Sequence, residues 1–365
     1  MTILDAMADA ALFASAFPPT ESWAAWRAFL GACFGLPMTD EQRAFYRQHT
    51  GRQTPPTGPA REAWLIVGRR GGKSRIAALV AVYLACFRDY RSVLAPGERG
   101  TLPIIAADRR QARTVFCYVT GLLDSCPMLA RMVSNRTAES IELTNGVTIE
   151  VHTASFRSVR GYTVVSCVLD EVAFWRTEDS ANPDREIVNA LRPAMATVPG
   201  ALLLAISSPY ARRGCLWDAY RQHHGRDGDL VLVWQAPTRA MNPTVPEAVI
   251  AAAYAEDEAA AAAECAVAWT WGHTQAIHSA SSTAWRQPRS SANTTGFTTS
   301  SGVFVGVLGA SDTRGSPAVL SASQVSLSWS LGIVMTGSVP ATGAPVTLAC
   351  RSRFQRERLS IAAGE

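Results

Sequence analysis

Short hydrophobic runs alternate with longer helical patterns between residues 63 and 234. The short runs have the length of buried strands, and the longer stretches carry apolar residues at helical spacing. The predicted strands are Ala63–Val67, Leu102–Ala107, Ile141–Leu143, Val147–Val151, Val164–Leu169, Ala201–Ile206 and Leu230–Trp234. The predicted helices between them are Ser74–Phe87, Arg109–Leu123, Asp184–Thr197 and Leu216–His223. This alternation predicts an α/β fold with a mainly parallel sheet covered on both faces.

Helical patterns flank this alternating region on both sides. Residues 1–60 contain apolar residues at helical spacing, and a capping box at Thr39 or Asp40 with Gln42 or Arg43 begins a further helix. Residues Glu247–Cys265 form one long Ala-rich pattern. We therefore expect an N-terminal helical segment over 1–60, a core domain over 61–240 and a linker helix over 241–265.

The composition changes after Cys265. Residues 266–365 are rich in Ser and Thr, show no sustained helical period, and contain only three acidic residues, Asp312, Glu357 and Glu365. The seven basic residues of this tail account for the formal net charge of +4, because the first 265 residues carry 27 basic and 27 acidic groups. We expect this region to be poorly ordered or degenerate. Bulk charge does not identify a nucleic-acid-binding protein, so any DNA site must be a local patch.

Composition excludes several classes of protein. Hydrophobic residues make up 48% of the chain and charged residues 18%, which argues against wholesale disorder. No stretch approaches the roughly 18 apolar residues that a membrane span needs. The N-terminus carries Asp5 and Asp9 without early Lys or Arg, unlike a secretory signal. The eight cysteines show no CxxC spacing, so we expect reduced thiols and a cytoplasmic protein.

The strongest chemical signal is the sequence VGRRGGKS at Val67–Ser74, between a predicted strand and a predicted helix. Backbone N–H groups of such a glycine-rich turn and of the helix N-terminus bind phosphates. Lys73 is the only lysine among the 34 Lys and Arg residues, which suggests a site where Arg would not fit. It stands where the motif requires a lysine. Lys73 would reach the β- and γ-phosphates, and Ser74 would ligate Mg²⁺.

This loop departs from the common GxxxxGK[ST] pattern. Val67 occupies the place of the first glycine, and Gly68 comes one residue late. Arg69 and Arg70 add positive charge beside Gly71 and Gly72. The alternative interpretation is a glycine-rich strand–helix turn that binds no ligand.

Two further motifs stand at predicted strand ends. VVSCVLDE places Asp170 and Glu171 after a buried strand, where Asp170 would hold Mg²⁺ and Glu171 would act as general base. The strand over 201–206 leads into Ser207 and Ser208, which would lie beside the phosphate loop if the two strands are neighbours. The alternatives are a solvated acidic turn for the first pair and a plain strand exit for the second.

Weaker candidates surround these motifs. Arg160 would contact DNA or act as an arginine finger toward a neighbouring subunit, as Arg69 and Arg70 also could. Gln42 is a candidate to read adenine, with an exposed helix residue as the alternative. Candidates for nucleic-acid contact or coupling are Asp108, Gln111 and Arg113, and a weak candidate metal site comprises His223, His224, Asp227 and Asp229.

Taken together, GRRGGKS, SVRGYTVVSCVLDEVAFW and LLLAISSPYARRGCLW resemble the large subunit of tailed-phage terminase, the ATP-driven DNA-packaging motor. The resemblance covers roughly residues 20–265. It implies a RecA/helicase-like P-loop ATPase domain that uses ATP and Mg²⁺. It further implies double-stranded DNA, a terminase small subunit, the portal protein of a procapsid and other copies of the chain as partners, in the cytoplasm of a host cell.

The same resemblance assigns roles to individual residues and exposes a departure. It implies that Lys73 and Ser74 hold the nucleotide and Mg²⁺, that Glu171 is the catalytic base, and that Ser207 and Ser208 couple hydrolysis to movement. The family's RNase H-like nuclease uses several carboxylates for two metal ions, and residues 266–365 offer too few. We expect no nuclease activity, and hypothesise a reading-frame shift near Cys265 in a prophage gene. A helicase-type ATPase and an inactive remnant remain alternatives.

Overall fold

A computed structural model describes residues 1–154, 161–175 and 183–269, together with the backbone of six short strands further along the chain. The chain divides into two compact units, Met1–Ser282 and Thr283–Glu365, which are described separately. The first unit contains every motif on which the sequence-based predictions of function depend.

The first unit is built on a nine-stranded sheet. Eight strands follow the order β3-β4-β5-β2-β7-β8-β1-β9, and β6 pairs with β2. The strands are β1 (Glu62–Val67), β2 (Gly100–Ala106), β3 (Val133–Arg136), β4 (Ser140–Leu143), β5 (Val147–Thr153), β6 (Thr163–Val164), β7 (Ser166–Asp170), β8 (Leu202–Ser207) and β9 (Val231–Ala236). Every pairing from β5 to β9 along this order is parallel, whereas β3 with β4 and β4 with β5 pair antiparallel. The predicted α/β class with a mainly parallel sheet is therefore confirmed.

The strand order brings three sequence motifs to one edge of this sheet. Strand β8 lies between β1 and β7, with Ile66 of β1 opposite Ser207, and Asp170 of β7 opposite Ile206. Parallel strands end at the same edge, so the loop after β1, the acidic pair after β7 and the serines after β8 become neighbours. The role predicted for Ser207 and Ser208 required that their strand lie next to the strand before the loop, and β8 does pair with β1.

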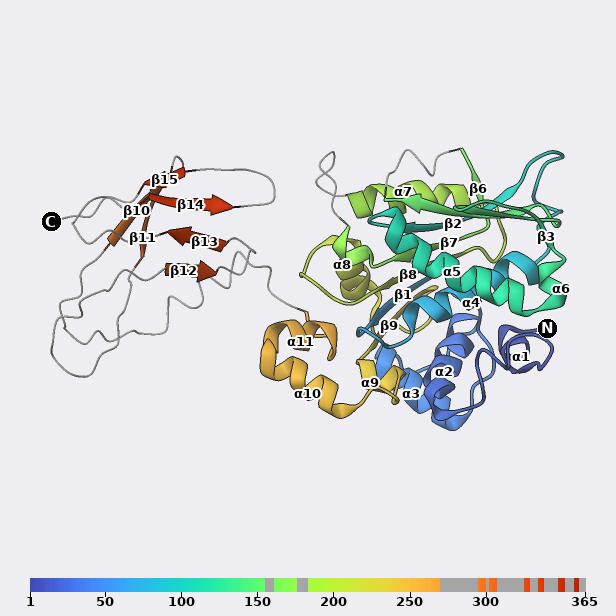
Figure 1. The fold of residues 1–365 in the computed structure, drawn as a ribbon. Coiled ribbons are helices and arrows are strands. Elements are labelled where there is room, and N and C mark those ends of the chain that lie inside the picture. Colours follow the sequence, from blue (N-terminus) through green and yellow to red (C-terminus); the bar gives the residue numbers. More distant parts are fainter. Residues whose placement is uncertain are drawn as a thin grey trace. The chain divides into compact units, whose positions relative to one another are not determined.

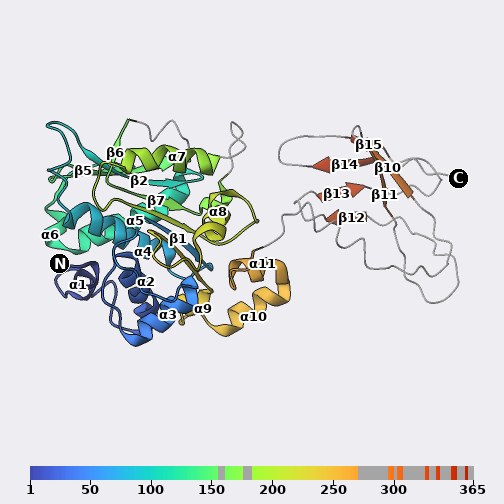
Figure 2. The same ribbon diagram turned by 180° about the vertical axis from the view of Figure 1, so that it is seen from behind.

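Helices cover both faces of the sheet (Figures 1 and 2). Helices α4 (Lys73–Phe87) and α5 (Arg109–Ser125) contact each other and the strands β2, β5, β7 and β8. Helices α7 (Pro183–Met195) and α8 (Gly214–His223) contact each other and the strands β6, β9 and β1. Strands buried on both faces read as nearly continuous apolar runs, which explains why EAWLIV and LLLAIS in β1 and β8 lack alternation.

The N-terminal helices pack against one another. They are α1 (Ile3–Ala8), η1 (Glu21–Trp23), α2 (Ala24–Cys33) and α3 (Asp40–Thr50). Helix α1 is also in contact with α4, and α3 is in contact with β9. Helix α3 begins with the predicted capping box, in which Thr39 and Gln42 exchange hydrogen bonds between side chain and backbone. Helix α2 buries most of its residues, including Trp26, and thus joins the core of the first unit.

The segment after β9 differs from the single long helix expected over Glu247–Cys265. It forms α9 (Thr238–Met241), α10 (Glu247–Glu256) and α11 (Glu258–Glu264). Asp257 breaks the pattern because its backbone is extended, with φ of −152°, and its side chain accepts a hydrogen bond from Ala260 N to begin α11. The Ala-rich composition predicted one continuous helix. It did not reveal this boundary, because an Asp within such a run can either continue the helix or cap a new one.

Short connecting elements complete the first unit. Helix α6 (Pro127–Ala130) follows α5, and η3 (Val172–Phe174) follows the acidic pair. Asn145-Gly146 joins β4 and β5 as the predicted hairpin turn, with Gly146 at φ of +84°. No helix of the described residues is both long and apolar enough to cross a membrane.

The second unit is described only as six strands. The strands β10 (Thr295–Thr299) and β11 (Gly302–Gly306) form an antiparallel pair. A separate antiparallel sheet contains β12 (Val325–Ser328), β13 (Val334–Gly337), β14 (Thr347–Arg351) and β15 (Arg358–Ser360). The three acidic residues of this region, Asp312, Glu357 and Glu365, lie outside the described residues, so the expected absence of a nuclease stays a prediction.

Candidate active site

The glycine-rich loop connects β1 to α4 and has two residues in left-handed backbone conformation. Gly72 has φ of +100°, which favours glycine, and Arg70 has φ of +59°, which is uncommon for a residue with a side chain. The chain reverses here so that α4 begins at Lys73 and points its N-terminus toward the carboxyl edge of the sheet. Among the described residues, no acceptor faces the backbone N–H groups of Arg70, Gly72, Lys73 and Ser74.

The lone lysine lies at the centre of this edge. The Lys73 side chain is 6% exposed, and its Nζ donates to Val67 O at 2.8 Å and to Ser208 Oγ at 3.1 Å. The same ammonium lies 3.4 Å from Glu171 Oε1. A compact ammonium with three donors fits this set of partners, whereas the planar fork of Arg does not. The prediction that position 73 is a place where Arg would not fit agrees with this geometry.

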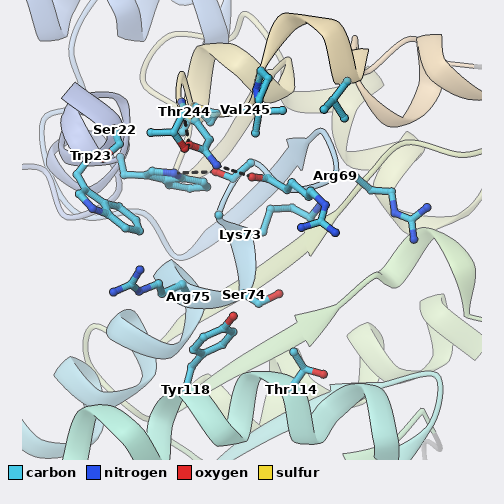
Figure 3. A pocket seen from close by; sticks show the side chains of 18 of the residues that line it. Ser22, Trp23, Arg69, Lys73, Ser74, Arg75, Thr114, Tyr118, Thr244 and Val245 are labelled. Carbon is cyan, nitrogen blue, oxygen red and sulfur yellow. Dashed lines mark hydrogen bonds between the residues drawn. The ribbon is translucent and has the colours of Figure 1, made fainter. Parts of the chain in front are cut away.

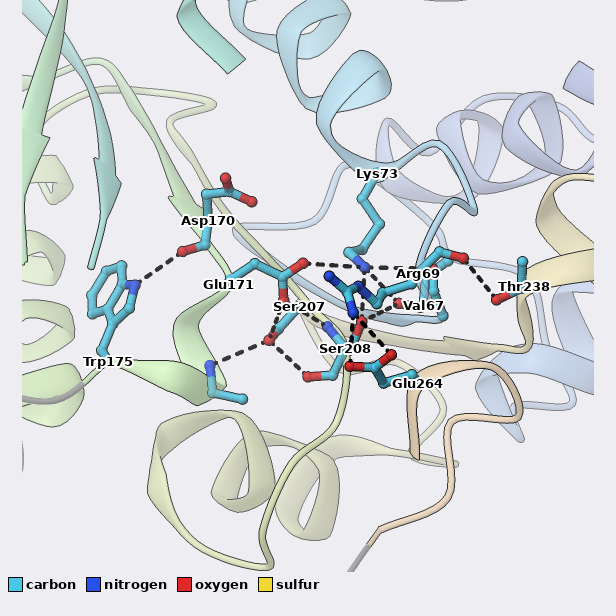
Figure 4. A network of polar contacts seen from close by, with 12 residues as sticks. Val67, Arg69, Lys73, Asp170, Glu171, Trp175, Ser207, Ser208, Thr238 and Glu264 are labelled. Carbon is cyan, nitrogen blue, oxygen red and sulfur yellow. Dashed lines mark hydrogen bonds and ion pairs between the residues drawn. The ribbon is translucent and has the colours of Figure 1, made fainter. Parts of the chain in front are cut away.

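Glu171 is held in an unusual conformation directly after β7. Its φ of +49° lies in the left-handed region, a conformation that persists in a residue with a side chain only where the surroundings fix it. Its backbone N–H donates to Ile206 O at 2.7 Å. Its carboxylate Oε2 accepts from Ser208 N at 3.0 Å and from Ser207 Oγ at 3.1 Å (Figure 4). The strained backbone therefore turns this carboxylate across the end of β8 toward Lys73.

The two serines connect the loop to the acidic pair. The Ser207 hydroxyl also lies 2.8 Å from Ser208 O and accepts from Ala173 N at 3.3 Å. The Ser208 hydroxyl lies 3.4 Å from Val67 O, the carbonyl that Lys73 also contacts. Both serines are buried. A change in the position of Glu171 or Lys73 would thus act directly on the end of β8.

Asp170 is a buried carboxyl group with one oxygen that lacks a hydrogen-bond partner among the described residues. The residue is 3% exposed, and Oδ1 has no hydrogen-bond partner among the described residues. Burial, and then the neighbouring negative charge of Glu171, raise the pKa of Asp170 to about 7. A polar atom that is buried without a partner is costly, so Asp170 is a candidate ligand rather than a structural residue.

Two cavities open onto this edge. The larger, with a volume of about 950 Å³, extends from the loop and Lys73 across to Trp23 and Tyr118 (Figure 3). The second, with a volume of about 420 Å³, brings Ser74, Asp170 and Glu171 together among its lining residues. The first is large enough for a nucleotide-sized ligand, since such pockets occupy roughly 300–1,000 Å³.

The predicted loop, acid and serine residues all meet here, but Gln42 does not. Its side-chain Oε1 accepts from Thr39 N at 3.0 Å at the start of α3, and Gln42 is not among the residues that line either cavity. The capping role dominates because the N-terminus of α3 needs an acceptor. The interpretation of Gln42 as an adenine reader gains no support from its position.

The weaker candidates for nucleic-acid contact or coupling have mixed outcomes. Arg160 lies outside the described residues. Gln111 lines the smaller cavity, whereas Arg113 pairs with Glu139 at 2.8 Å on the surface. Asp108 caps α5 by accepting from Gln111 N at 2.9 Å. Of the three described residues, Gln111 lines the site, whereas Asp108 and Arg113 line neither cavity.

The weak metal-site candidate around His223 fails. Within the described residues, no cluster of three or more His, Cys, Asp or Glu side chains could hold a metal ion. His223 instead contacts Asp229 through its Nδ1 atom, and Asp227 accepts from the backbone N–H groups of Gln53 and Thr54. A polar turn accounts for these residues.

Sequence reasoning missed the residues that surround the loop from outside. Glu264 lies at the end of α11, and its backbone O accepts a hydrogen bond from Arg69 N at 2.7 Å. The Glu264 carboxylate forms an ion pair with the Arg69 guanidinium at 3.0 Å. The Thr238 hydroxyl donates to Arg69 O. Glu264 and Thr238 lie 195 and 169 positions from Arg69, and the periodicity of one sequence carries no signal for such contacts.

The late glycine is explained by this outer segment. A Cβ atom on Gly68 would lie 2.2 Å from Thr238 Oγ1, 2.8 Å from Glu264 O and 2.9 Å from Cys265 O. Two of these three atoms belong to backbone that cannot rotate away. Glycine stands at position 68 because the first residue of α9 and the end of α11 lie directly against it. The segment predicted as a linker thus packs against the phosphate loop itself.

Known proteins match this chain in structure but not in sequence. No protein-family model matches the chain, and no curated protein sequence matches it. Solved structures do match, and they include phage large terminases, the family that the sequence motifs resemble. At identities of this level the similarity concerns the fold.

Three structures illustrate the similarity. The large terminase ATPase domain of Thermus phage P74-26 is 16% identical over 66% of this chain and 98% of that chain, with a TM-score of 0.46. The large terminase of bacteriophage HK97 is 18% identical over 66% of this chain and 52% of that one, with a TM-score of 0.43. A large terminase from a thermophilic bacteriophage, in complex with ADP, is 11% identical, with a TM-score of 0.44. That match covers 82% of this chain and 63% of the phage protein.

The packing at Gly68 yields a first prediction. Replacing Gly68 by Ala forces the loop or the overlying segment to move, and overpacking of this kind lowers the free energy of unfolding by about 1–3 kcal/mol. Gly121 within α5 is a matched control, because nothing lies within 4 Å of the position that a Cβ atom would take there. Gly121→Ala should raise the free energy of unfolding by about 0.5–1 kcal/mol. Urea titration of both variants measures these changes, and equal stabilities for the two would contradict the packing described.

The buried carboxyl group yields a second prediction. Because the pKa of Asp170 is about 7 in the folded protein and about 3.9 when unfolded, the unfolded chain loses this proton first as the pH rises. The contribution of Asp170 to stability therefore falls between about pH 4 and pH 7. Asp170→Asn should be as stable as the parent near pH 4 and more stable at pH 8, by up to about 4 kcal/mol.

Urea unfolding at both pH values in buffer containing EDTA measures this difference. Asp218→Asn serves as the control, since Asp218 pairs with Arg185 on the surface and is part of neither cavity. An Asp170→Asn variant whose advantage over the parent is the same at pH 4 and pH 8 would contradict the assignment of a raised pKa.

Proposed function

We propose that the chain is a P-loop ATPase that hydrolyses ATP at the edge of the sheet where β1, β8 and β7 end. The observation that supports this most is the convergence of Lys73, Glu171 and Ser208, from three motifs far apart in sequence, within hydrogen-bond or ion-pair distance. A glycine-rich turn without a ligand would not require a buried ammonium beside an acidic pair whose second residue, Glu171, has a left-handed backbone.

The triphosphate would bind along the loop. The unpartnered N–H groups of Arg70, Gly72, Lys73 and Ser74 and the positive end of α4 form the anion-binding surface among the residues described. The Lys73 ammonium would exchange its present acceptors for β- and γ-phosphate oxygens. Arg69 and Arg70 line the larger cavity and would add positive charge there.

The residues present fit Mg²⁺. Hard divalent cations prefer oxygen ligands, and Mg²⁺ in nucleotide sites takes one or two from protein, with the remainder from phosphate and water. Ser74 and Asp170, whose Oδ1 lacks a partner among the described residues, line the same cavity. When bound there, Mg²⁺ would neutralise charge on the phosphates, and Asp170 would act as a ligand directly or through water.

The chain's own groups would then carry the hydrolysis. Glu171 would accept a proton from the attacking water as that oxygen bonds to the γ-phosphorus, while the bond to the bridging oxygen breaks and ADP leaves. Ser208 N–H and the Ser207 hydroxyl hold the carboxylate in place, so that its position depends on β8. Lys73 would stabilise charge that develops on the phosphoryl oxygens.

Beyond ATP hydrolysis, we propose a terminase-type motor that translocates double-stranded DNA into a procapsid. The three sequence motifs support this assignment, and Ser207 and Ser208 stand between the base and the loop, where a coupling motif is needed. The small subunit and the portal protein would be its partners, together with other copies of the chain. DNA contact would be to phosphates, independent of sequence and strongly weakened by salt.

Two substitutions test the hydrolysis. Lys73→Ala should weaken ATP binding by roughly 10- to 150-fold, because it removes a charge-assisted contact worth about 1.5–3 kcal/mol. Glu171→Gln should leave ATP affinity within about twofold of the parent but lower turnover by about 10²- to 10⁴-fold. A coupled phosphate-release assay and filter binding of radiolabelled ATP measure these effects.

Glu150→Gln is the matched control, since Glu150 contacts His152 on β5 and lines neither cavity. Hydrolysis that survives unchanged in both Lys73→Ala and Glu171→Gln would refute the proposal. Linear double-stranded DNA should stimulate turnover without strand separation, and ATP-dependent unwinding of a forked duplex would instead favour a helicase.

A further inference from the structure

Three consecutive carbonyl groups of the phosphate loop are held by residues outside it. Arg69 O accepts from the Thr238 hydroxyl at 2.9 Å, Arg70 O from Asn242 Nδ2 at 2.8 Å, and Gly71 O from the Trp26 indole Nε1 at 2.9 Å. Trp26 comes from α2, whereas Thr238 begins α9 and Asn242 directly follows it. Donors from two separate segments thus converge on one short turn.

These carbonyl contacts also orient the amides on the other side of each peptide group. A peptide group is planar and trans, so its C=O and the following N–H point in opposite directions. Fixing Arg69 O aims the N–H of Arg70, and fixing Gly71 O aims the N–H of Gly72. Among the described residues, both of these amides lack an acceptor. Thr238 and Trp26 therefore turn free N–H groups toward the side of the loop where an anion would lie. Asn242 holds the peptide group between them, whose N–H, that of Gly71, donates to Gly68 O within the loop.

Trp26 is the most constrained of the three donors. Its side chain is fully buried, and its Nε1 would lie 3.1 Å from a Cβ atom on Gly72. The indole thus packs directly against the left-handed residue that precedes α4. Met241 and Asn242 also line the larger cavity, and Asn242 holds the carbonyl of Arg70, the second left-handed residue.

We propose that Trp26, Thr238 and Asn242 are positioning residues of the phosphate site, which fix the loop so that the amides of Arg70 and Gly72 are aimed at phosphate oxygens. This inference rests on the proposed function. None of the three touches the phosphates in this scheme. Their contribution is to remove the loop's conformational freedom before binding, which raises affinity for the phosphate part of a nucleotide.

Binding of inorganic tripolyphosphate and of ATP, each measured by calorimetry, tests the proposal. Trp26→Phe keeps an aromatic ring but removes the N–H, and Thr238→Val keeps the shape but removes the hydroxyl. Each should weaken both ligands by about three- to tenfold, the value of one net hydrogen bond. The hydrogen bond from Asn242 to Arg70 O is more exposed. Asn242→Ala should likewise weaken the binding of both ligands. The Trp26→Phe, Thr238→Val double variant should lose more than either single variant.

Trp64→Phe is the matched control. Trp64 is equally buried and its indole donates to Glu62 Oε2 at 3.0 Å, but at the start of β1, away from the loop. Trp64→Phe should lower thermal stability about as much as Trp26→Phe does, but it should leave the affinity for tripolyphosphate unchanged. Equal losses of affinity in Trp64→Phe and Trp26→Phe would reduce the effect to general destabilisation and overturn the proposal.

The outcomes separate this inference from the function on which it rests. If the parent protein binds both ligands and Lys73→Ala loses them while Thr238→Val and Asn242→Ala bind normally, the positioning role is wrong and the ATPase proposal stands. If Trp26→Phe does not fold, the Thr238 and Asn242 variants decide the question alone. If the parent binds neither tripolyphosphate nor ATP, both proposals fall together.

Discussion

The site depends on one buried ammonium group and the acceptors that make its burial possible. Desolvating a charge costs several kcal/mol unless it is paired and hydrogen-bonded. Lys73 meets this requirement with Val67 O, Ser208 Oγ and Glu171. These acceptors stand at the ends of the three strands β1, β8 and β7, which must be adjacent and parallel to supply them. The burial of this lysine, the only one in an Arg-rich chain, therefore depends on the strand order of the sheet.

The same constraint accounts for the strain at this edge. Arg70 and Glu171 both have positive φ, and both are fixed by contacts from elsewhere: Asn242 holds the carbonyl of Arg70, and β8 holds Glu171 through its backbone and its carboxylate. Strain of this kind persists where the surroundings over-determine the backbone, and it is concentrated at functional sites. Asp170, buried with no partner for Oδ1 among the described residues, adds a further cost.

The parts predictable from sequence were those written in local patterns. Continuous apolar runs predicted β1, β7 and β8, and the glycine-rich turn with its lysine predicted which strand end carries the loop. The adjacency of β8 to both others could only be stated as a condition. The interpretation of Gln42 as an adenine reader gained no support because its side chain caps α3. The helix break at Asp257 was not predicted because it lies within an Ala-rich run. Trp26 has the spacing of a core residue, which it is, but its indole N–H has a partner that periodicity cannot indicate.

The segment from Thr238 to Cys265 shows why the remainder could not be predicted. Residues 241–265 were expected to form a linker helix, yet Thr238 N donates to Cys265 O, Glu264 accepts from Arg69, and a side chain at position 68 would collide with Thr238, Glu264 and Cys265. A contact between residues 195 positions apart leaves no periodic signature in one sequence. Its consequence is mechanical: any displacement of the phosphate loop must break or carry with it the hydrogen bonds of α9 and α11. The end of α11 is thus tied to the loop together with the donors that orient it.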